Sequence, residues 1–432
     1  MKNNTSFLIG IGLFLTFYGI YLFFSFSLYQ TGVFRKYDLL FQADVPRVIN
    51  NYTSKGRQDR TSVHPLFVLL VNPIGRLLVK VIPNKILVAI GINSFFGALG
   101  VALAYSFFLC NSKELIYSLL FAVLFGISTS QLVWSSVPET YSLGICSLIL
   151  NYILFAFDYK KEIIHRRLWI LAGLFSIAVA TTNFVQSIIL YTFALVKTSK
   201  EKWRMKISSI ISFVFCVLSI TIVLALMQKM IYPSSNLFFV PRSILYEINE
   251  SGWFNFYFLK DPLKVIEQIV KNFFLVNIIA PIPNSQYYEA LISDAGITEK
   301  GMQVTFSDSW NYLSIGWVGL FMWITLLTIG FYKGIRGIFS KSTGGLFYLA
   351  IFSCLLFEAL LHSCYGWFMH GYAELFLYTG YFTFLTLIIA SWSINKKYNL
   401  FRILLGALCI LGALNNAFIV NYIINYYSNI NY

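Results

Sequence analysis

Charged residues are scarce in this chain, and their scarcity excludes a soluble globular protein. Asp, Glu, Lys and Arg make up only 12% of the 432 residues, whereas 58% are hydrophobic. A soluble domain carries about 25% charged residues because it must cover its surface. The apolar residues form long continuous runs, not the alternating segments of about ten residues that are typical of a membrane β-barrel. We therefore predict an all-α polytopic membrane protein.

Metal-binding and disulfide patterns are also missing. The six cysteines lie mostly in apolar segments and none forms a CxxC pair, so we expect neither a zinc site nor a disulfide framework. The net charge of +14 comes with no basic helix and no known nucleic-acid-binding module. In a membrane protein the excess of Lys and Arg is expected in cytoplasmic loops and against anionic membrane lipid. We therefore expect no nucleic acid among the partners.

Hydrophobic runs predict about eleven membrane spans, within a range of about nine to thirteen, in one domain covering residues 1–432. The first run follows Met-Lys-Asn-Asn and is too long for the core of a signal peptide. The polar sequence Thr181-Thr182-Asn183 divides a later run that is too long for one helix. The predicted spans are 7–28, 86–110, 115–134, 140–157, 168–182, 184–196, 207–230, 312–332, 346–361, 373–392 and 403–427.

The positions of Lys and Arg predict the orientation of these spans. Segment 64–83 is apolar, but Pro73, Arg76 and Lys80 interrupt it, which favours helices at the membrane interface over a span. With this segment kept on one side, the basic loops fall on the cytoplasmic side together with the N-terminus. If the segment crossed the membrane, every later loop would change sides, and the basic loops would violate the positive-inside rule, by which Lys and Arg gather in cytoplasmic loops. The connections assigned to the cytoplasmic side are 111–114, 158–167, 197–206, 333–341 and 393–402.

Two long external loops follow from this topology, 29–85 and 231–310. The first loop is expected to hold interfacial helices and the catalytic residues, and it carries a dense group of Lys and Arg on the side where they are normally rare. An anionic ligand at the outer interface, such as a lipid phosphate or diphosphate, would explain this group. The alternative is that a long loop is translocated regardless of its charge. The Lys-, Asn- and Ile-rich composition suggests a bacterial inner membrane.

The predicted topology gathers ionisable and polar residues at the external surface, where such groups are functional candidates. His370 and Glu374 lie four residues apart and would share a helix face, but two ligands are too few for a metal site, so we expect no metal and no other cofactor. Glu358 and His362 have the same spacing within an apolar span, and we interpret them as a buried structural pair. The candidates are Asp38, Asp44, Arg47, Arg57, Arg60, His64, Glu139, Asn183, Arg242, His370, Glu374 and Tyr378.

Several motifs, in a fixed order after the first span, carry a resemblance to a known family. They are Asp44-x-x-Arg47, His64-Pro65-Leu66, Trp134 followed by Glu139-Thr-Tyr141-Ser-Leu143, and the broken hairpin from Gly173 to Asn183. This pattern resembles the GT-C superfamily of membrane glycosyltransferases, which includes protein O-mannosyltransferases and lipid A aminoarabinose transferases. The resemblance covers roughly residues 7–195, and beyond them only Glu374-Leu-Phe-Leu-Tyr378 is similar.

The resemblance implies transfer of a sugar from a polyprenyl phosphate or diphosphate carrier to a hydroxyl of a glycan, lipid or protein, with inversion at the anomeric carbon. Asp44 is then the expected general base, with Asp38 as the alternative, and Glu139 would assist Asp44 or position the acceptor. The structural alternatives are a helical Asp44–Arg47 pair, a helix N-terminal Glu139 and a plain His64-Pro65 turn. The residues expected to bind phosphate or sugar are Arg47, Arg57, Arg60, His64, Asn183, Arg242, His370, Glu374 and Tyr378.

Two other classes of function use the same membrane surface. A polysaccharide polymerase or ligase also consumes a polyprenyl diphosphate and typically has a large late external loop, such as 231–310. A flippase or transporter of lipid-linked sugars is expected to show an internal repeat and polar breaks at mid-membrane depth. The sequence has no repeat and its polar residues cluster toward one face, so a glycosyltransferase is our preferred interpretation.

Overall fold

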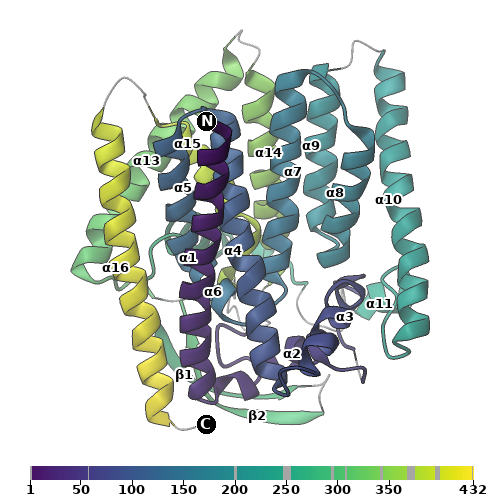
Figure 1. The fold of residues 1–432 in the computed structure, drawn as a ribbon, viewed down its shortest axis with the longest axis vertical. Helices are drawn as coiled ribbons and strands as arrows, with labels where there is room; N and C mark the ends of the chain where they lie inside the picture. Colours follow the sequence, from purple (N-terminus) through teal and green to yellow (C-terminus); the bar gives the residue numbers. More distant parts are fainter. Residues whose placement is uncertain are drawn as a thin grey trace.

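The computed structural model describes residues 2–56, 58–198, 202–246, 254–292, 296–306, 309–340, 344–366, 375–394, 399–430 and 432. Long helices form the frame of the molecule and run along its longest axis (Figure 1). Within the described ranges, seven helices are long and apolar enough to cross a membrane. They are α1 (Lys2–Gln30), α4 (Lys85–Ser112), α7 (Tyr141–Lys161), α10 (Trp203–Ile231), α13 (Ser314–Phe339), α14 (Gly345–His362) and α16 (Asn399–Ile430).

The predicted count of eleven spans is wrong, because several apolar runs form helices that are too short to cross. The runs 168–182 and 184–196 form α8 (Arg166–Val179) and α9 (Asn183–Thr198), which have 14 and 16 residues. At 1.5 Å per residue they are about 21 and 24 Å long, whereas a hydrocarbon core is about 30 Å thick. The turn between them falls at Thr181 and Thr182 and lies inside the bundle rather than at its end (Figure 1).

Two other predicted spans are broken. The run 115–134 forms α5 (Leu115–Ile127) and α6 (Thr129–Ser136), bent by 57° at their junction, so the number of spans is eight if this pair counts as one. The run 373–392 forms η5 (Leu375–Tyr381) and α15 (Thr383–Ser391), and every described residue from Leu375 to Ala390 is buried. A helix of nine residues is about 14 Å long, so α15 fills the centre of the bundle instead of spanning it.

Buried asparagines make the breaks in these helices tolerable. A broken helix leaves carbonyl groups unpaired, and in a membrane protein other protein groups must bond them. Asn93 in α4 donates to the carbonyl oxygen of Trp134 at 2.9 Å, near the end of α6. Asn416 in α16 donates to the carbonyl oxygen of Ile127 at 2.8 Å, where α5 ends. Both asparagines are almost completely buried, so they stabilise a bundle that contains irregular backbone in its interior.

The first long loop folds at one end of the bundle, where α1 ends and α4 begins (Figure 1). It contains a 3₁₀ turn, η1 (Val33–Arg35), and the helices α2 (Val45–Thr53) and α3 (Phe67–Val79). Pro46 occupies the first turn of α2, where its missing N–H costs no helical hydrogen bond. Helix α3 is apolar but has only 13 residues, too few to cross a membrane.

The second long loop is folded, and it contains the one β-sheet in the described ranges, which we did not predict. Its helical pieces are α11 (Pro241–Leu245), η3 (Tyr257–Leu259), α12 (Pro262–Lys271) and η4 (Asn272–Val276). Strands β1 (Asn284–Ile292) and β2 (Ile297–Thr305) form an antiparallel hairpin that pairs Asn284 with Thr305.

The β-hairpin covers the first loop. The backbone N–H of Val304 donates to Leu39 at 2.9 Å, and the N–H of Phe41 donates back to Val304 at 3.0 Å. The Tyr427 hydroxyl of α16 also donates to the Leu39 carbonyl, at 2.6 Å. Segment 38–43 is therefore held between parts of the chain that lie more than 250 residues away in sequence.

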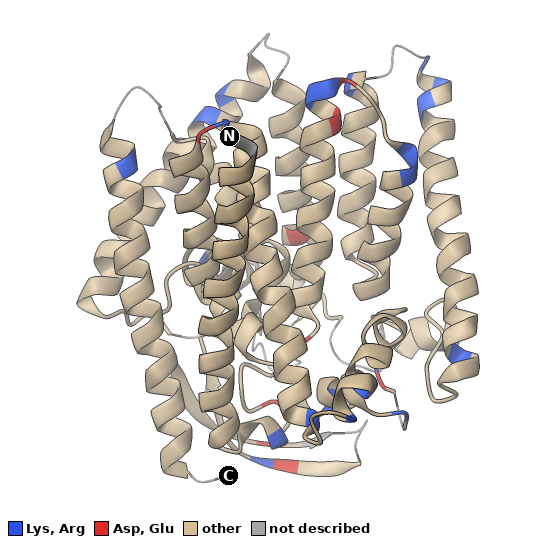
Figure 2. Ribbon diagram, in the orientation of Figure 1, with Lys and Arg blue, Asp and Glu red and all other residues tan. Residues whose placement is uncertain are grey.

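Basic residues occupy both ends of the bundle (Figure 2). One group lies at the end that carries the N-terminus, where α7 ends and α8, α10 and α16 begin. The second group lies at the opposite end, with α2, α3 and the β-hairpin (Figure 2). Basic residues alone therefore do not distinguish the two ends, and the end with α2 and α3 carries the candidate site.

Candidate functional site

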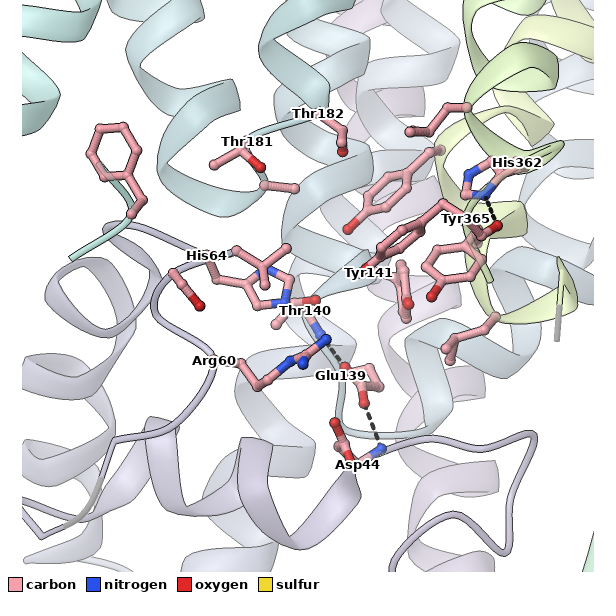
Figure 3. A pocket seen from close by; sticks show the side chains of 18 of the residues that line it. Asp44, Arg60, His64, Glu139, Thr140, Tyr141, Thr181, Thr182, His362 and Tyr365 are labelled. Carbon is pink, nitrogen blue, oxygen red and sulfur yellow. Dashed lines mark hydrogen bonds between the residues drawn. The ribbon is translucent and has the colours of Figure 1, made fainter. Parts of the chain in front are cut away.

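A cavity of about 350 Å³ lies where the first loop meets the interior of the bundle (Figure 3). The start of α2 and the segment before α3 form one side, the α8–α9 turn closes it, and the end of α14 and η5 form the other side. Segment 238–244 completes the lining. The polar lining residues are Gln42, Asp44, Arg47, Arg60, Ser62, His64, Glu139, Thr140, Tyr141, Thr181, Thr182, Ser243, His362, Tyr365, Tyr378 and Tyr381.

Asp44 has an accessible carboxylate at the start of α2. It is the N-cap residue of that helix, but its side chain makes no capping hydrogen bond, unlike most N-cap aspartates. Its Oδ2 atom accepts from Nε of Arg47 at 2.8 Å, and 32% of its side chain is exposed. One carboxylate oxygen is therefore fixed by Arg47, and the side chain lines the cavity.

Glu139 lies behind Asp44 and both of its carboxylate oxygens accept backbone hydrogen bonds. Oε1 accepts from the N–H of Asp44 and Oε2 from the N–H of Thr140, each at 2.9 Å. Burial raises the pKa of Glu139 to about 7, although the charge of Arg47 and these two N–H groups act in the opposite direction. This geometry fastens the start of α2 to the start of α7, so it supports a role in positioning Asp44 rather than direct catalysis.

Arg47 is buried and only partly satisfied. Its side chain is 7% exposed, and no residue in the described part of the chain bonds its Nη1 atom. Burial lowers the pKa of Arg47, but the charges of Asp44 and Glu139 outweigh this effect and raise the pKa above its usual value. A buried guanidinium N–H without a partner is costly, which makes Arg47 a good donor for an anionic ligand. Arg60 adds a second cationic side chain to the same cavity.

His64 ties the first loop to the end of α8. Its Nδ1–H donates to the Val179 carbonyl at 2.6 Å, and the N–H of Leu66 donates to Ala178 at 3.0 Å. Burial, together with the charge of Arg47, lowers the pKa of His64 to about 3, so the imidazole is neutral. A neutral imidazole that donates through Nδ1 presents only an acceptor at Nε2. The geometry thus favours the structural role of this residue over hydrogen-bond donation to a phosphate.

Asp38, the alternative base, does not line the cavity. Its Oδ2 atom accepts from the Tyr288 hydroxyl of β1 at 2.7 Å. Burial, followed by the negative charge of Asp44, raises the pKa of Asp38 to about 8. Asp38 and Asp44 therefore have different surroundings, and Asp44 is the one that shares the cavity with Arg47 and Glu139.

The other predicted residues fall into three groups. Tyr378 lines the cavity. Asn183, at the start of α9, is fully buried outside the lining, and its amide has no partner among the described residues. Arg242 is exposed on α11 and does not line the cavity. Three predicted residues, Arg57, His370 and Glu374, lie outside the described residues.

Sequence reasoning missed most of the aromatic side of the cavity. Tyr141, Tyr365 and Tyr381 line it together with Tyr378, and they come from three separate segments. Tyr141 belongs to a motif noted in the sequence, but tyrosine is common throughout this chain and no local pattern marked Tyr365 or Tyr381. Glu358 and His362 are both 1% exposed with 3.4 Å between Oε2 and Nε2, so the predicted buried pair is present, but His362 also reaches the cavity wall.

Over the described ranges, no three His, Cys, Asp or Glu side chains lie close enough together to hold a metal ion. Comparison with models of protein families, with curated proteins and with solved structures finds no match for this chain. The function must therefore be inferred from the cavity itself.

Proposed function

We propose that this protein is a membrane glycosyltransferase that moves a sugar from a polyprenyl phosphate or diphosphate carrier to an acceptor hydroxyl, with Asp44 as the general base. The observation that carries the proposal is the pairing of two groups in one cavity. The Asp44 carboxylate is oriented by Arg47 and still exposed, while the Arg47 Nη1 atom is buried and unpaired over the described residues. A general base and a cationic group that binds the leaving phosphate are the two groups that this transfer requires.

In the proposed reaction, the acceptor oxygen attacks the anomeric carbon while Asp44 accepts the hydroxyl proton. The bond between the anomeric carbon and the phosphate oxygen breaks, and the phosphate leaves with the electron pair. Arg47 and Arg60 stabilise its negative charge. The N-termini of α7 and α9 also lie at the cavity, and helix N-termini favour anions. Direct displacement of this kind inverts the configuration at the anomeric carbon.

The location of the cavity fits a lipid-linked donor. Phe238, Ile244 and Leu361 are apolar lining residues, and Ile244 is 45% exposed. An isoprenoid chain in the bilayer could contact these side chains while its phosphate reaches Arg47. We infer that this end of the molecule lies at the external face of a bacterial inner membrane, with the N-terminus in the cytoplasm. The short connections at the N-terminal end are basic, as expected of cytoplasmic loops, and we assign the basic residues at the opposite end to binding of the anionic donor.

The test compares two isosteric variants of the first loop, Asp44→Asn and Asp38→Asn. Membranes containing each variant are supplied with radiolabelled polyprenyl-linked sugars, and release of label from the lipid fraction is measured. Loss of a general base should lower the rate by about 10² to 10⁴-fold in Asp44→Asn, whereas Asp38→Asn should retain most activity. Wild-type transfer by Asp44→Asn at equal protein abundance would refute the assignment of the base.

A further inference from the structure

The cavity has two chemically different halves. Asp44, Arg60 and Glu139 lie on one side, and Tyr141, His362 and Tyr365 lie on the other (Figure 3). The first half is charged and suits the reacting phosphate and hydroxyl groups. The second half has no Lys, Arg, Asp or Glu among its described lining residues, so it must receive a different part of the substrate.

Tyrosine rings form a continuous wall in the second half. The ring centroids of Tyr141 and Tyr381 are 5.2 Å apart, and those of Tyr365 and Tyr378 are 5.6 Å apart. Tyr141 and Tyr378 connect the two pairs at 6.4 Å with nearly perpendicular planes. Such edge and tilted contacts are favourable geometries for aromatic rings, so the wall is pre-organised. It lines the cavity with tyrosine rings that also carry phenolic hydroxyls.

His362 stacks on Tyr378 and is itself held on both sides. The centroids of the two rings are 4.5 Å apart with an angle of 29° between their planes. Nε2 of His362 faces Oε2 of Glu358 at 3.4 Å, and Nδ1 lies 3.3 Å from the Tyr365 carbonyl. Because both ring nitrogens face protein atoms, His362 acts on the cavity through the Tyr378 ring rather than by bonding a ligand with its own nitrogens.

Glu358 is in turn fixed from the interior of the bundle. Its Oε1 atom accepts from Nε2 of Gln186 in α9 at 2.6 Å, and the Tyr152 hydroxyl of α7 donates to Oε1 of Gln186. Glu358 is 1% exposed within a membrane-spanning helix, where an ionisable residue needs a functional reason or a partner. This chain of contacts connects three helices to the position of one tyrosine ring.

We propose that the tyrosine wall is the subsite for the transferred sugar. Glu358 and His362 are positioning residues that hold the Tyr378 ring in its place in this wall. This inference rests on the proposed function. A sugar ring has apolar C–H faces that pack on aromatic rings and hydroxyls that exchange hydrogen bonds with tyrosine. An isoprenoid chain would gain nothing from the hydroxyls, and a phosphate would prefer the arginines on the opposite side.

The first experiment measures binding of two lipid probes to the purified full-length protein. The probes are decaprenyl phosphate and decaprenyl phosphate carrying glucose, mannose, galactose or arabinose. Wild type should bind both, and at least one sugar-bearing probe should bind roughly three- to tenfold more tightly than the bare phosphate. Tyr378→Ala should lose this gain and keep its affinity for decaprenyl phosphate, whereas Tyr378→Phe, which retains the ring, should keep most of the gain.

Tyr348→Ala is the matched control, because Tyr348 lines a separate cavity with Trp392 and does not contact the tyrosine wall. It should leave both affinities unchanged. If no sugar-bearing probe binds more tightly than decaprenyl phosphate, or if Tyr378→Ala weakens both probes equally, the subsite assignment is wrong while the phosphate site stands. If wild type binds neither probe, the proposed function itself fails.

The second experiment tests the positioning role with Glu358→Gln and His362→Ala. Glu358→Gln keeps the size of the side chain and an oxygen for the contact with Gln186, but it replaces the carboxyl oxygen that faces His362 with an amide NH₂ group. Both variants should reduce by at least half the factor by which the sugar-bearing probe binds more tightly than decaprenyl phosphate. The affinity for decaprenyl phosphate itself should stay unchanged. A purely structural role would lower the affinity for both probes together, and unchanged affinity for the sugar-bearing probe would also overturn the assignment.

Discussion

Two buried polar clusters at opposite ends of the bundle show the difference between a structural site and a reactive one. At the N-terminal end, Asp158 is fully buried and its carboxylate accepts three hydrogen bonds. The donors are Nδ1 of His165 at 2.6 Å, the N–H of His165 at 3.0 Å and Nε1 of Trp169 at 2.9 Å. Such a satisfied group stabilises the turn between α7 and α8 and has little capacity left for a ligand.

The cluster of Asp44, Arg47 and Glu139 at the cavity end is not fully hydrogen-bonded, in contrast to Asp158. The Asp44 side chain is partly exposed, and Nη1 of Arg47 is buried without a partner over the described residues. An unsatisfied buried group costs about 1–3 kcal/mol, and Arg47, unlike the enclosed Asn183, lines a cavity in which a ligand can supply the missing contact. The degree to which hydrogen-bonding groups are satisfied, rather than burial or charge alone, separates the two clusters.

Separate substitutions of Asp44 and Asp158 should give the largest effects, and the effects should be opposite: one on activity and the other on stability. Asp44→Asn should abolish transfer but leave the melting temperature close to that of wild type. Asp158→Ala should lower stability by roughly 1–3 kcal/mol, because the His165 and Trp169 donors lose their acceptor. Its activity per folded molecule should stay near wild type. Activity assays and thermal unfolding on the same preparations check both, and a strong loss of specific activity in Asp158→Ala would contradict the distinction.

Loss of the unpaired guanidinium should have the next largest effect. Arg47→Gln should weaken binding of decaprenyl phosphate by about tenfold or more, since hydrogen bonds to charged groups contribute about 1.5–3 kcal/mol. Arg47→Lys should recover only part of this affinity because an ammonium cannot bond Asp44 and a phosphate in the same fork geometry. Arg402→Gln, at the N-terminal end, is the control and should bind like wild type. Equal binding by wild type and Arg47→Gln would remove Arg47 from the site.

Stability of the cavity end should depend on pH. Burial raises the pKa of Glu139 to about 7 and that of Asp38 to about 8, well above their values in an unfolded chain. Their contribution to stability is therefore complete at low pH and is lost as the pH rises from about 4 through 8. The melting temperature of the purified protein should fall over this window, and Asp38→Asn should flatten the fall. An equally steep fall in Asp38→Asn would show that this carboxyl does not titrate there.

Removal of one hydroxyl from the β-hairpin should have the smallest effect. Tyr288→Phe deletes the hydrogen bond to Asp38 and should lower the free energy of unfolding by about 1 kcal/mol. Transfer activity should change less than twofold, because Asp38 lies outside the cavity lining. Thermal unfolding and the transfer assay measure the two effects. A loss of transfer as large as that of Asp44→Asn would link the hairpin directly to the active site.

The sequence predicted the long helices well because hydrophobic length is a local property. The runs 86–110 and 207–230 lie within α4 and α10, and 403–427 lies within α16. The prediction of spans failed where tertiary contacts determine whether an apolar run crosses the membrane. In α15, for example, the apolar residues are buried by other helices instead of by lipid. An apolar run of 18 residues cannot reveal whether a distant side chain, such as Asn416, will bond the carbonyls of a break.

The candidate site was predictable to a similar extent. Charge in an apolar chain marked Asp44, Arg47 and Glu139, and the topology placed them on one side. The hydrogen bond that Glu139 accepts from the backbone N–H of Asp44 and the hairpin contact that keeps Asp38 out of the cavity depend on residues about 100 and 250 positions away. No local pattern encodes such contacts, and Tyr365 and Tyr381 of the tyrosine wall were missed for the same reason.

The short hairpin of α8 and α9 has a consequence for the lipid around the protein. With helices of about 21 and 24 Å, this part of the molecule matches a thinner bilayer than the rest of the bundle. The membrane is expected to thin locally beside α8 and α9, which brings headgroups and water closer to the α8–α9 turn above Asp44. Activity reconstituted in lipids of increasing acyl length should therefore decline, even though no residue of the cavity has changed.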